Sequence, residues 1–410
     1  MVFRWILVIA ITALIQVYAF QAVKTFTSNR IVHILYWIVV VFILALFYIQ
    51  SFYYVSSRGF SHFMSYSLGL FFSLFLFQSF LILFLFLEDS IRLPQALYRY
   101  MTTQQTEGML PERRKFISQI ALGLAAIPFT ALLIGMVRGK YNYKVLKYTL
   151  TFDDLPDAFD GLTLAQISDI HSGSFDNPEK VAYGVDLVNQ QNPDLILFTG
   201  DIVNNKTTEL YPYQSIFSKL SAPMGVYSIL GNHDYGDYVD WESEAAKRQN
   251  MEDLKRVQKE MGFHLLLNES VSLEKEGEKI SLVGVENWGK GRFKKAGDLE
   301  KAVADVAPED FKILLSHDPS HWEAQVLSHP FPFHLTLSGH THGMQFGIDI
   351  PGVIKWSPAK WRYKQWAGIY NQGQQYLNVN RGFGYLAYPG RVGIWPEISL
   401  ITLKKKPVAI

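Results

Sequence analysis

The sequence predicts an all-α membrane region followed by an α/β domain with mixed β-sheet structure. Nearly all the long apolar runs lie before residue 140. From about Tyr141 onwards, short apolar stretches typical of strands alternate with stretches typical of helices. Such alternation favours a parallel sheet, and hairpin signals late in the chain add antiparallel pairing. We therefore divide the 410 residues into a transmembrane region, 1–140, and a second domain, 141–410.

Four segments of the first region are candidates for membrane-spanning helices. About 20 apolar residues cross the hydrocarbon core as a helix, and the first three segments lack the polar face that a soluble helix needs. The fourth segment is the weakest because Gly123, Pro128 and Gly135 interrupt it. The four segments are residues 3–23, 31–55, 63–87 and 116–137.

Arg113 and Arg114 stand directly before the fourth segment and have two interpretations. They resemble a twin-arginine export signal, and they equally suit the cytoplasmic flank of an ordinary spanning helix. Both interpretations send the second domain outward. In this orientation the inner loops hold seven cations and the outer flanks hold six, so the count alone does not fix the orientation. The clustering of cations before the fourth segment favours it. We expect an integral protein of the plasma (inner) membrane, anchored by the fourth helix, with the second domain on the external face.

Composition limits the chemistry of the second domain. The net charge of +1 and the pI of about 7.8 give no global basic field, so nucleic acid is not expected as a partner. The chain has no cysteine, which excludes disulfides, thiolate ligands and cysteine nucleophiles. Any metal site must therefore use imidazole, carboxylate and amide groups.

The strands and helices of the second domain follow from apolar runs bounded by turn residues. Helices are expected at residues 181–189 and 242–261. The expected strands are residues 162–168, 194–199, 225–230, 271–274, 279–285, 312–316, 333–338, 375–380 and 398–404.

Five of these strands end in groups that bind metals. In α/β sheets, ligands bind outside the carboxyl ends of strands, where residues distant in sequence meet. A set without sulfur suits two divalent ions of Mn, Fe or Zn, and one carboxylate must bridge them. Asp201 is the best bridge because its Gly-Asp turn allows close backbone approach. The predicted ligands are Asp169, His171, Asp201, Asn232, His317, His340 and His342.

These blocks, in this order, resemble the calcineurin-like metallophosphoesterase superfamily over residues 145–405. The resemblance implies a mixed β-sandwich flanked by helices and a water activated between two metals. It places Asp169, His171 and His342 on one metal and Asn232, His317 and His340 on the other, with Asp201 bridging. It also implies that His233 is no ligand but assists the leaving oxygen, and that Asp234 orients His233.

The C-terminal glycine-rich blocks, 380–384 and 389–393, resemble the membrane-associated branch of that superfamily. Some members of the branch hydrolyse phosphate or pyrophosphate bonds of lipids. Arg381 and Arg391 are therefore candidates for substrate binding, although either could instead pair with a structural carboxylate. Asn287 departs from the family pattern, which often has Asp, and this puts substrate geometry in doubt.

Two other features have a functional and a plain interpretation. The aromatic cluster formed by Trp356, Trp361, Tyr363 and Trp366 could be an interfacial belt, an acyl-binding wall or a packed surface loop. His321 follows His317 by four residues and should point away from the site if the segment after Pro319 is helical.

Three functions fit at least part of this pattern: a two-metal phosphoesterase, a zinc peptidase, and a membrane receptor or scaffold without turnover. A zinc peptidase would need a His-Glu-x-x-His helix, which the sequence lacks, and a scaffold that had lost activity would be expected to lack a ligand or the His233 equivalent. We therefore predict a membrane-anchored dinuclear-metal hydrolase of phosphate ester, phosphodiester or pyrophosphate bonds, including those of lipid-linked substrates. Its expected partners are a phosphorylated substrate and membrane lipids; the sequence leaves its oligomeric state open.

Overall fold

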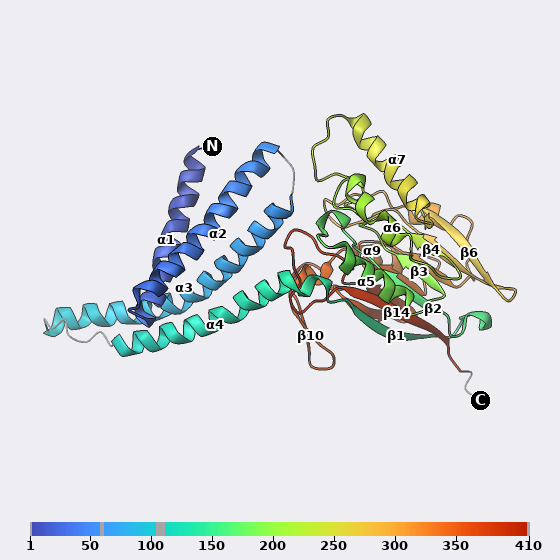
Figure 1. The fold of residues 1–410 in the computed structure, drawn as a ribbon. Coiled ribbons are helices and arrows are strands. Elements are labelled where there is room, and N and C mark those ends of the chain that lie inside the picture. Colours follow the sequence, from blue (N-terminus) through green and yellow to red (C-terminus); the bar gives the residue numbers. More distant parts are fainter. Residues whose placement is uncertain (1, 58–60, 104–110, 408–410) are drawn as a thin grey trace. The chain divides into compact units, whose positions relative to one another are not determined.

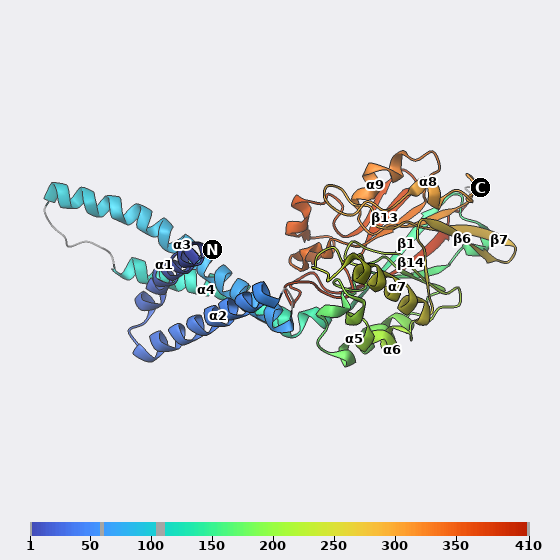
Figure 2. The ribbon, with the colours of Figure 1, turned by 90° about the horizontal axis from the view of Figure 1, so that it is seen from above.

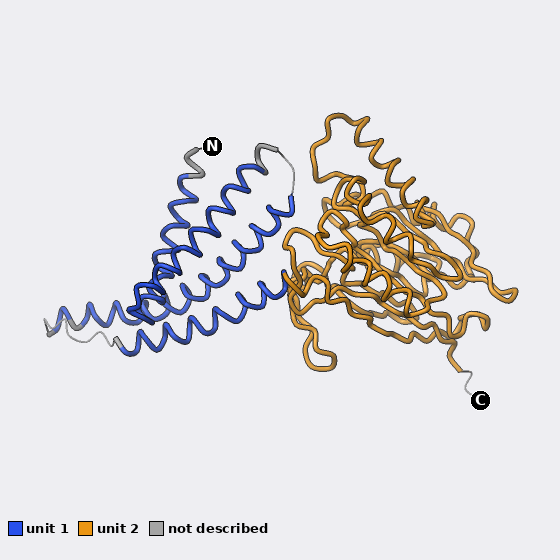
Figure 3. The backbone as a smooth tube through the Cα atoms, in the orientation of Figure 1, with its two compact units in different colours: residues 1–136 blue, residues 137–410 orange. Residues whose placement is uncertain are grey.

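A computed structural model describes residues 2–57, 61–103 and 111–407. The chain forms two compact units, Met1–Met136 and Val137–Ile410, which are coloured separately in Figure 3. We call them the first and second units and describe each by itself.

The first unit consists of the helices α1 (Val2–Phe26), α2 (Arg30–Ser57), α3 (His62–Thr103) and α4 (Pro111–Val137). All four are long and apolar enough to cross a membrane, as the sequence predicted. α3 continues well beyond the predicted end at residue 87 and contains Pro94. Good helix formers, such as Glu, Arg, Leu, Gln and Ala, follow the apolar run and extend the helix.

Small and polar residues connect the helices of the first unit. Ala19 and Ala22 of α1 are buried with Ala121 and Ala125 of α4, and small side chains allow helices to approach closely. The Gln16 amide donates to Gln78 Oε1 at 2.9 Å. Polar contacts of this kind fix which helix faces meet inside a lipid phase.

A charged group within the C-terminal half of α3 joins three helices. Asp89 of α3 accepts from Arg114 Nη1 of α4 at 2.6 Å and from the Tyr18 hydroxyl of α1 at 2.9 Å. Arg92 and Glu88 complete this group. We call these four charged residues, Glu88, Asp89, Arg92 and Arg114, the ionic cluster. Arg114, half of the arginine pair noted in the sequence, thus has a structural partner.

The second unit contains two six-stranded sheets and a separate two-stranded hairpin (Figure 1). The strands of the first sheet are, in order, β1 (Lys144–Phe152), β14 (Glu397–Lys405), β2 (Thr163–Ile167), β3 (Leu195–Phe198), β4 (Val226–Ser228) and β5 (Phe263–Leu265). Those of the second are β12 (Gly368–Gln372), β13 (Gln375–Val379), β9 (Leu335–Ser338), β8 (Lys312–Leu315), β7 (Glu278–Gly284) and β6 (Glu269–Lys275). The hairpin pairs β10 (Ile348–Ile350) with β11 (Ile354–Trp356).

Both sheets are mixed. β2, β3, β4 and β5 run parallel in the first sheet, as do β7, β8, β9 and β13 in the second. Antiparallel pairs are β14 with β2, β6 with β7, and β12 with β13. Because β2, β3 and β4 share a direction, their carboxyl ends lie at one edge of their sheet, and those of β8 and β9 share an edge of the other.

The sheets pack face to face, and helices cover their outer faces (Figure 2). Leu164 and Leu197 of the first sheet share an apolar core with Ile313 and Leu337 of the second. Helices α5 (Pro178–Asn189), α6 (Gln214–Phe217) and α7 (Glu244–Glu260) pack on the first sheet. Helices α8 (Leu299–Ala302) and α9 (Ser320–Ala324) pack on the second. This is the mixed β-sandwich flanked by helices that the sequence predicted.

The strands differ from prediction in two ways. β1, β5, β12 and the hairpin were not predicted, because β1 is a partly exposed edge strand with interspersed lysines and the hairpin strands are very short. Several predicted strands also ran one or two residues too far. For example, residues 162–168 were expected where β2 covers Thr163–Ile167, because the chain leaves the ladder just before the site.

Candidate metal centre

The backbone is strained where the strands end. Five of the seven predicted ligands have positive φ, a conformation that costs free energy for residues with a β-carbon and is concentrated at functional sites. These residues and angles are Asp169 (51°), His171 (48°), Asp201 (60°), His340 (71°) and His342 (50°). The surrounding hydrogen bonds must therefore hold the strand ends in place.

Backbone contacts connect the loops that follow the strands. Asp169 N donates to Gly200 O at 2.9 Å, and His171 N donates to Asp201 O at 3.0 Å, so the loops after β2 and β3 lie side by side. Glycine is needed where they meet the next loops. A β-carbon on Gly231 would lie 2.2 Å from Asp201 Oδ1, and one on Gly339 would lie 2.2 Å from Asp169 Oδ2.

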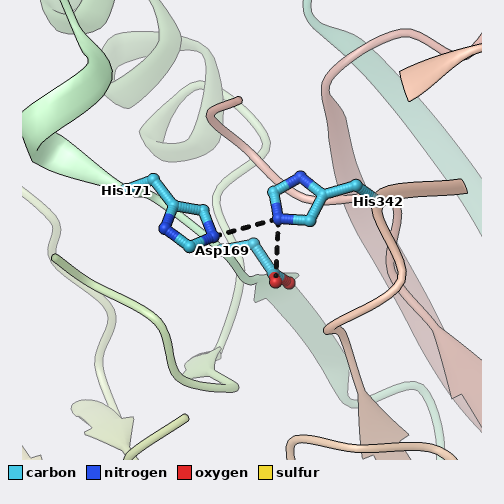
Figure 4. Close-up of side chains that lie close together, drawn as sticks. All are labelled: Asp169, His171 and His342. Carbon is cyan, nitrogen blue, oxygen red and sulfur yellow. Dashed lines mark hydrogen bonds and ion pairs between the residues drawn. The ribbon is translucent and has the colours of Figure 1, made fainter. Parts of the chain in front are cut away.

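Asp169, His171 and His342 form the first candidate metal-binding cluster (Figure 4). Their ligand atoms all lie within 4.8 Å of one another, and all three side chains are buried. His171 Nε2 lies 3.0 Å from His342 Nε2, which lies 3.2 Å from Asp169 Oδ1. The loops after β2 and β9 thus bring two imidazoles and a carboxylate to one point.

Asp201, His317 and His340 form the second candidate cluster. His317 Nε2 lies 3.1 Å from Asp201 Oδ2, while its Nδ1 faces Thr199 O at 2.7 Å. A backbone carbonyl only accepts, so Nδ1 of His317 carries a proton, and Nε2 is the atom that would donate a lone pair to a cation. Asn232 Oδ1 lies 2.8 Å from His340 Nδ1, which places the predicted amide ligand beside this cluster.

Asp201 reaches both clusters with one oxygen. Its Oδ2 lies 3.1 Å from His317 Nε2 in the second cluster and 3.6 Å from His171 Nε2 in the first. Its Oδ1 accepts from His233 N at 2.8 Å, which fixes the rotation of the carboxylate. This is the position that a carboxylate bridging two cations requires.

Burial and neighbouring charges shift the pKa values of the residues in the two clusters. Burial lowers the pKa of His171 well below its ordinary value, so its imidazole is neutral and can donate a lone pair. Burial alone would raise the pKa of Asp201, but the charges of His317 and His233 lower it well below its ordinary value. For His317, burial alone would lower the pKa, but the charge of Asp201 raises it to about 10. A cation binding here would therefore displace a proton from His317.

His233 belongs to neither cluster and lines the pocket in front of them. Its Nδ1 lies 2.8 Å from Asn204 O, so Nδ1 carries the proton and Nε2 is available to a ligand. The ring is half-buried and lies 4.9 Å, centroid to centroid, from that of His171. The contact with Asn204, which the sequence did not suggest, orients this histidine.

The structure contradicts the role predicted for Asp234. Its carboxylate accepts from the backbone amides of Gly231 and Asp201 at 2.8 Å and of Ile202 at 2.9 Å. Asp234 therefore joins the loops after β3 and β4, while His233 is oriented by a carbonyl. Burial and the nearby charge of Asp201 raise the pKa of Asp234 to about 7. The prediction was wrong because an acidic residue next to a histidine in sequence points elsewhere in this turn.

The two arginines predicted to bind substrate have structural partners instead. Arg381 is buried and pairs with Glu397 and Asp349. Arg391 is fully buried; its Nε donates to Gly384 O at 2.8 Å, and its Nη2 lies 3.1 Å from His342 Nδ1. Neither lines the pocket in front of the clusters. The alternative interpretation, in which an arginine pairs with a structural carboxylate, holds for Arg381.

Three residues in contact with the site were not among the predicted site residues. The Tyr363 hydroxyl lies 2.7 Å from His340 Nε2, and the buried Asp318 Oδ2 lies 3.4 Å from the same atom. The Tyr238 hydroxyl accepts from Asn232 Nδ2 at 2.9 Å. Asp318 could have been suspected because it directly follows His317 at a strand end. Tyr238 carries no comparable signal, because only the fold brings it to Asn232.

An open pocket of about 330 Å³ lies in front of the two clusters. Besides the ligand residues it is lined by Phe293 and Arg362, whose guanidinium lies 5.3 Å from the Phe293 ring. The loop that carries Phe293 is held by Asn287, whose side chain donates to Lys294 O at 2.8 Å. The departure from the family pattern at Asn287 thus falls on a residue that shapes the pocket wall.

A two-sheet α/β sandwich with two groups of imidazole and carboxylate ligands at its strand ends defines a metal-dependent phosphoesterase. Comparison with known proteins identifies the family. Residues 162–344 match the calcineurin-like phosphoesterase family, and residues 3–140 match the transmembrane domain described as that of a probable calcineurin-like phosphoesterase. The chain belongs to the calcineurin-like metallophosphoesterases and is a membrane protein with a family transmembrane domain.

The similar proteins cover between 54% and 79% of this chain. The uncharacterized metallophosphoesterase YkuE of Bacillus subtilis is 31% identical over 306 residues, which cover 71% of this chain and 97% of YkuE. A transmembrane protein with metallophosphoesterase domain of Danio rerio is 27% identical over 336 residues, covering 79% of this chain and 71% of that protein. Among solved structures, a phosphopantetheinyl hydrolase of Mycobacterium tuberculosis is 14% identical, with 54% of this chain and 89% of that chain covered and a TM-score of 0.31.

Proposed function

We propose that the protein hydrolyses phosphate ester, phosphodiester or pyrophosphate bonds of a membrane-borne substrate, using two divalent ions of Mn, Fe or Zn. The observation that carries the proposal is the position of Asp201, whose Oδ2 faces an imidazole of each cluster at 3.1 and 3.6 Å. A single-metal site would need only one of these contacts.

The donor set supports two ions of this kind. Asp169, His171 and His342 would hold one ion, and the other would be held by Asn232, His317 and His340, with Asp201 shared. Nitrogen and carboxylate donors without sulfur match Mn, Fe and Zn. When bound, such ions acidify a water into a nucleophile and neutralise the charge that develops on the phosphoryl oxygens.

The chain's own groups around the ions have separate tasks. His233 faces the pocket with Nδ1 held by Asn204 O, so Nε2 can carry a proton to the leaving oxygen. With Nδ1 of His340 directed at the second ion, its Nε2–H would donate to Tyr363 or Asp318, which would fix the ring and its tautomer. Asp234 keeps the loops after β3 and β4 together and so positions Asp201 and Asn232.

We further propose that the protein lies in the plasma (inner) membrane with the second unit on the external face. The cationic stretch Arg113, Arg114 and Lys115 at the start of α4 supports this orientation. Its partners would be a phosphorylated, lipid-linked substrate and the surrounding lipids. Reporter fusions placed after Lys147 would test the orientation, because an enzyme active only outside the membrane should be active there.

A substrate screen tests the function. Full-length protein loaded with Mn²⁺ should hydrolyse an aryl phosphodiester, and chelation should abolish this activity. Lipid pyrophosphates, phospholipids and nucleotides are then compared in proteoliposomes at equal phosphate concentration. Turnover of a lipid-linked substrate above that of nucleotides supports the proposal. If protein with two bound ions per chain cleaves none of these compounds, the proposal is wrong.

A further inference from the structure

The hairpin of β10 and β11 forms a small sheet of its own, joined through residues 351–353. In its register Ile348 lies opposite Trp356, Ile350 lies opposite Ile354, and Asp349 lies opposite Lys355. Side chains alternate between the faces of a strand, so one face carries the apolar pairs and the other carries the polar pair. An isolated two-stranded hairpin is at best marginally stable in water, so its faces need partners.

The polar face of the hairpin contacts the rest of the second unit. Asp349 accepts from the buried guanidinium of Arg381, which also pairs with Glu397 of β14. Lys355 Nζ donates to Ala367 O and lies 5.3 Å from the centre of the Trp366 ring. These contacts hold the hairpin in place and turn its apolar face outward.

The apolar face is bare. Ile348 and Ile350 are 46% and 51% exposed, Ile354 is 44% exposed, and Val353 at the turn is 78% exposed. Trp361, which is 76% exposed, lies five residues after Trp356, and the two rings are 6.0 Å apart. A contiguous apolar patch of this kind on a folded domain marks an interaction surface. We call the residues Ile348, Ile350, Val353, Ile354 and Trp361 the apolar hairpin face.

We propose that the apolar hairpin face inserts into the headgroup region of the lipid bilayer. Aliphatic side chains beside tryptophan and cations are typical of interfacial membrane contacts. Lys360 and Arg362 are exposed next to Trp361, and Asp349, the carboxylate within the hairpin, is already paired with Arg381. This excess of positive charge is complementary to anionic headgroups.

The length of the connecting chain brings the bilayer within reach. Residues 138–143 separate the end of α4 from the start of β1. Six residues span at most about 20 Å when fully extended, so β1 begins no farther than that from the end of α4. A protein partner would have to compete with a bilayer that is always present at this distance.

The docked hairpin would present the pocket to the lipid surface. Met344 and Tyr363, which line the pocket, belong to the segments immediately before and after the hairpin. The pocket would then open at the level of the headgroup phosphates. This consequence rests on the proposed function, whereas insertion of the hairpin does not.

The test uses the absence of cysteine from the chain. Val353→Cys in the full-length protein carries a polarity-sensitive NBD label and is reconstituted in vesicles of phosphatidylcholine and phosphatidylglycerol. Glu252→Cys, on the exposed side of α7, is the matched control. The label at residue 353 should emit at shorter wavelength and lose about half its intensity to nitroxide lipids, and the control should stay unquenched. Equal, water-like emission from both labels would overturn the proposal.

A second pair of variants guards against misfolding and against another occupant. Val353→Asp should remove most of the quenching of a label attached through Trp361→Cys, while Val353→Leu should retain it. An unchanged unfolding temperature of the full-length protein in detergent shows that both variants are folded. Because quenching needs no turnover, its result is independent of the proposed function. Lipid quenching that survives Val353→Asp, or efficient 353-to-353 crosslinking without lipid quenching, would exclude bilayer insertion.

Discussion

Buried polar groups are arranged differently in the two units. In the first unit they satisfy one another across helices: Gln16 bonds to Gln78, and Arg114 pairs with Asp89. At the strand ends of the second unit, imidazole lone pairs and carboxylates converge on common points instead. Burying such groups is costly unless each finds a partner, so the first arrangement connects helices and the second requires cations. Buried polar groups whose partners lie within the chain are thus structural, whereas buried groups that need a partner from outside the chain indicate a functional site.

Removing the shared carboxylate should have the largest effect. Asp201→Asn keeps the shape but loses the charge that faces both clusters, so hydrolysis should fall by at least about 10³-fold. Elemental analysis should show fewer than two ions per chain. Asp186→Asn, on the exposed side of α5, is the control and should change neither quantity. Full metal content with full activity in Asp201→Asn would refute the bridging role.

The next largest effect should come from His233, which stands outside both clusters. His233→Ala should lower the rate by about 10²- to 10⁴-fold, because a positioned general acid is lost. Metal content should not change. The loss should be larger for an alkyl ester than for a p-nitrophenyl ester, whose leaving group needs no proton. An equal loss for both esters would show that His233 is not the proton donor.

The structure brings six of the seven predicted ligands into the two candidate clusters, because each follows the end of a strand by no more than four residues. Asp169, Asp201 and His317 are recognisable within their local blocks. Contacts between segments distant in sequence were harder to predict from the sequence. For example, Asp154 Oδ2 lies 2.7 Å from His334 Nε2, 180 residues away. No local pattern encodes such a contact, since the sandwich fold alone creates it.

The same limit applies to the partners of Asp234 and Arg381. Asp234 was assigned to its neighbour in sequence, but the turn directs its carboxylate to backbone amides, including that of Asp201. The partners of Arg381 are Glu397 and Asp349, which become its neighbours only when β14 and the hairpin are in place. Residue type therefore predicted which side chains form charged contacts, but only the fold determines the partners of those contacts.

A satisfied histidine close to the site sharpens the comparison. The ring of His321, four residues after His317, contacts Ser316 Oγ and Gln325 Oε1, each at 2.8 Å. His321 lies in a helical segment, which was expected to turn its ring away from the site. Burial lowers the pKa of His321 to about 4, although Gln325 and Asp318 oppose the shift. This histidine is therefore structural, unlike the histidines of the two clusters.

The pH dependence of stability follows from that shift. Between pH 6.5 and about 4 the unfolded chain binds a proton at His321 that the folded protein does not, so stability falls as the pH drops through this window. The full difference is about 3 kcal/mol. His321→Gln should flatten the dependence of the unfolding temperature on pH in this window. An unchanged slope would mean that other groups dominate acid unfolding.

The smallest effect is expected from the ionic cluster of the first unit. Asp89 and Arg114 approach to 2.6 Å between α3 and α4, and their side chains are 14% and 15% exposed. A double-mutant cycle with Asp89→Asn and Arg114→Gln should give a coupling free energy of about 1 to 3 kcal/mol, measured as unfolding of the full-length protein in detergent. Arg113→Gln, which removes the same charge one residue earlier, should show no coupling to Asp89. Hydrolysis of a soluble phosphodiester should be unaffected in all these variants, because this pair connects helices and holds no ligand. Zero coupling between Asp89 and Arg114 would remove the contrast between the two units, since buried polar groups of the first unit would then add nothing to its packing.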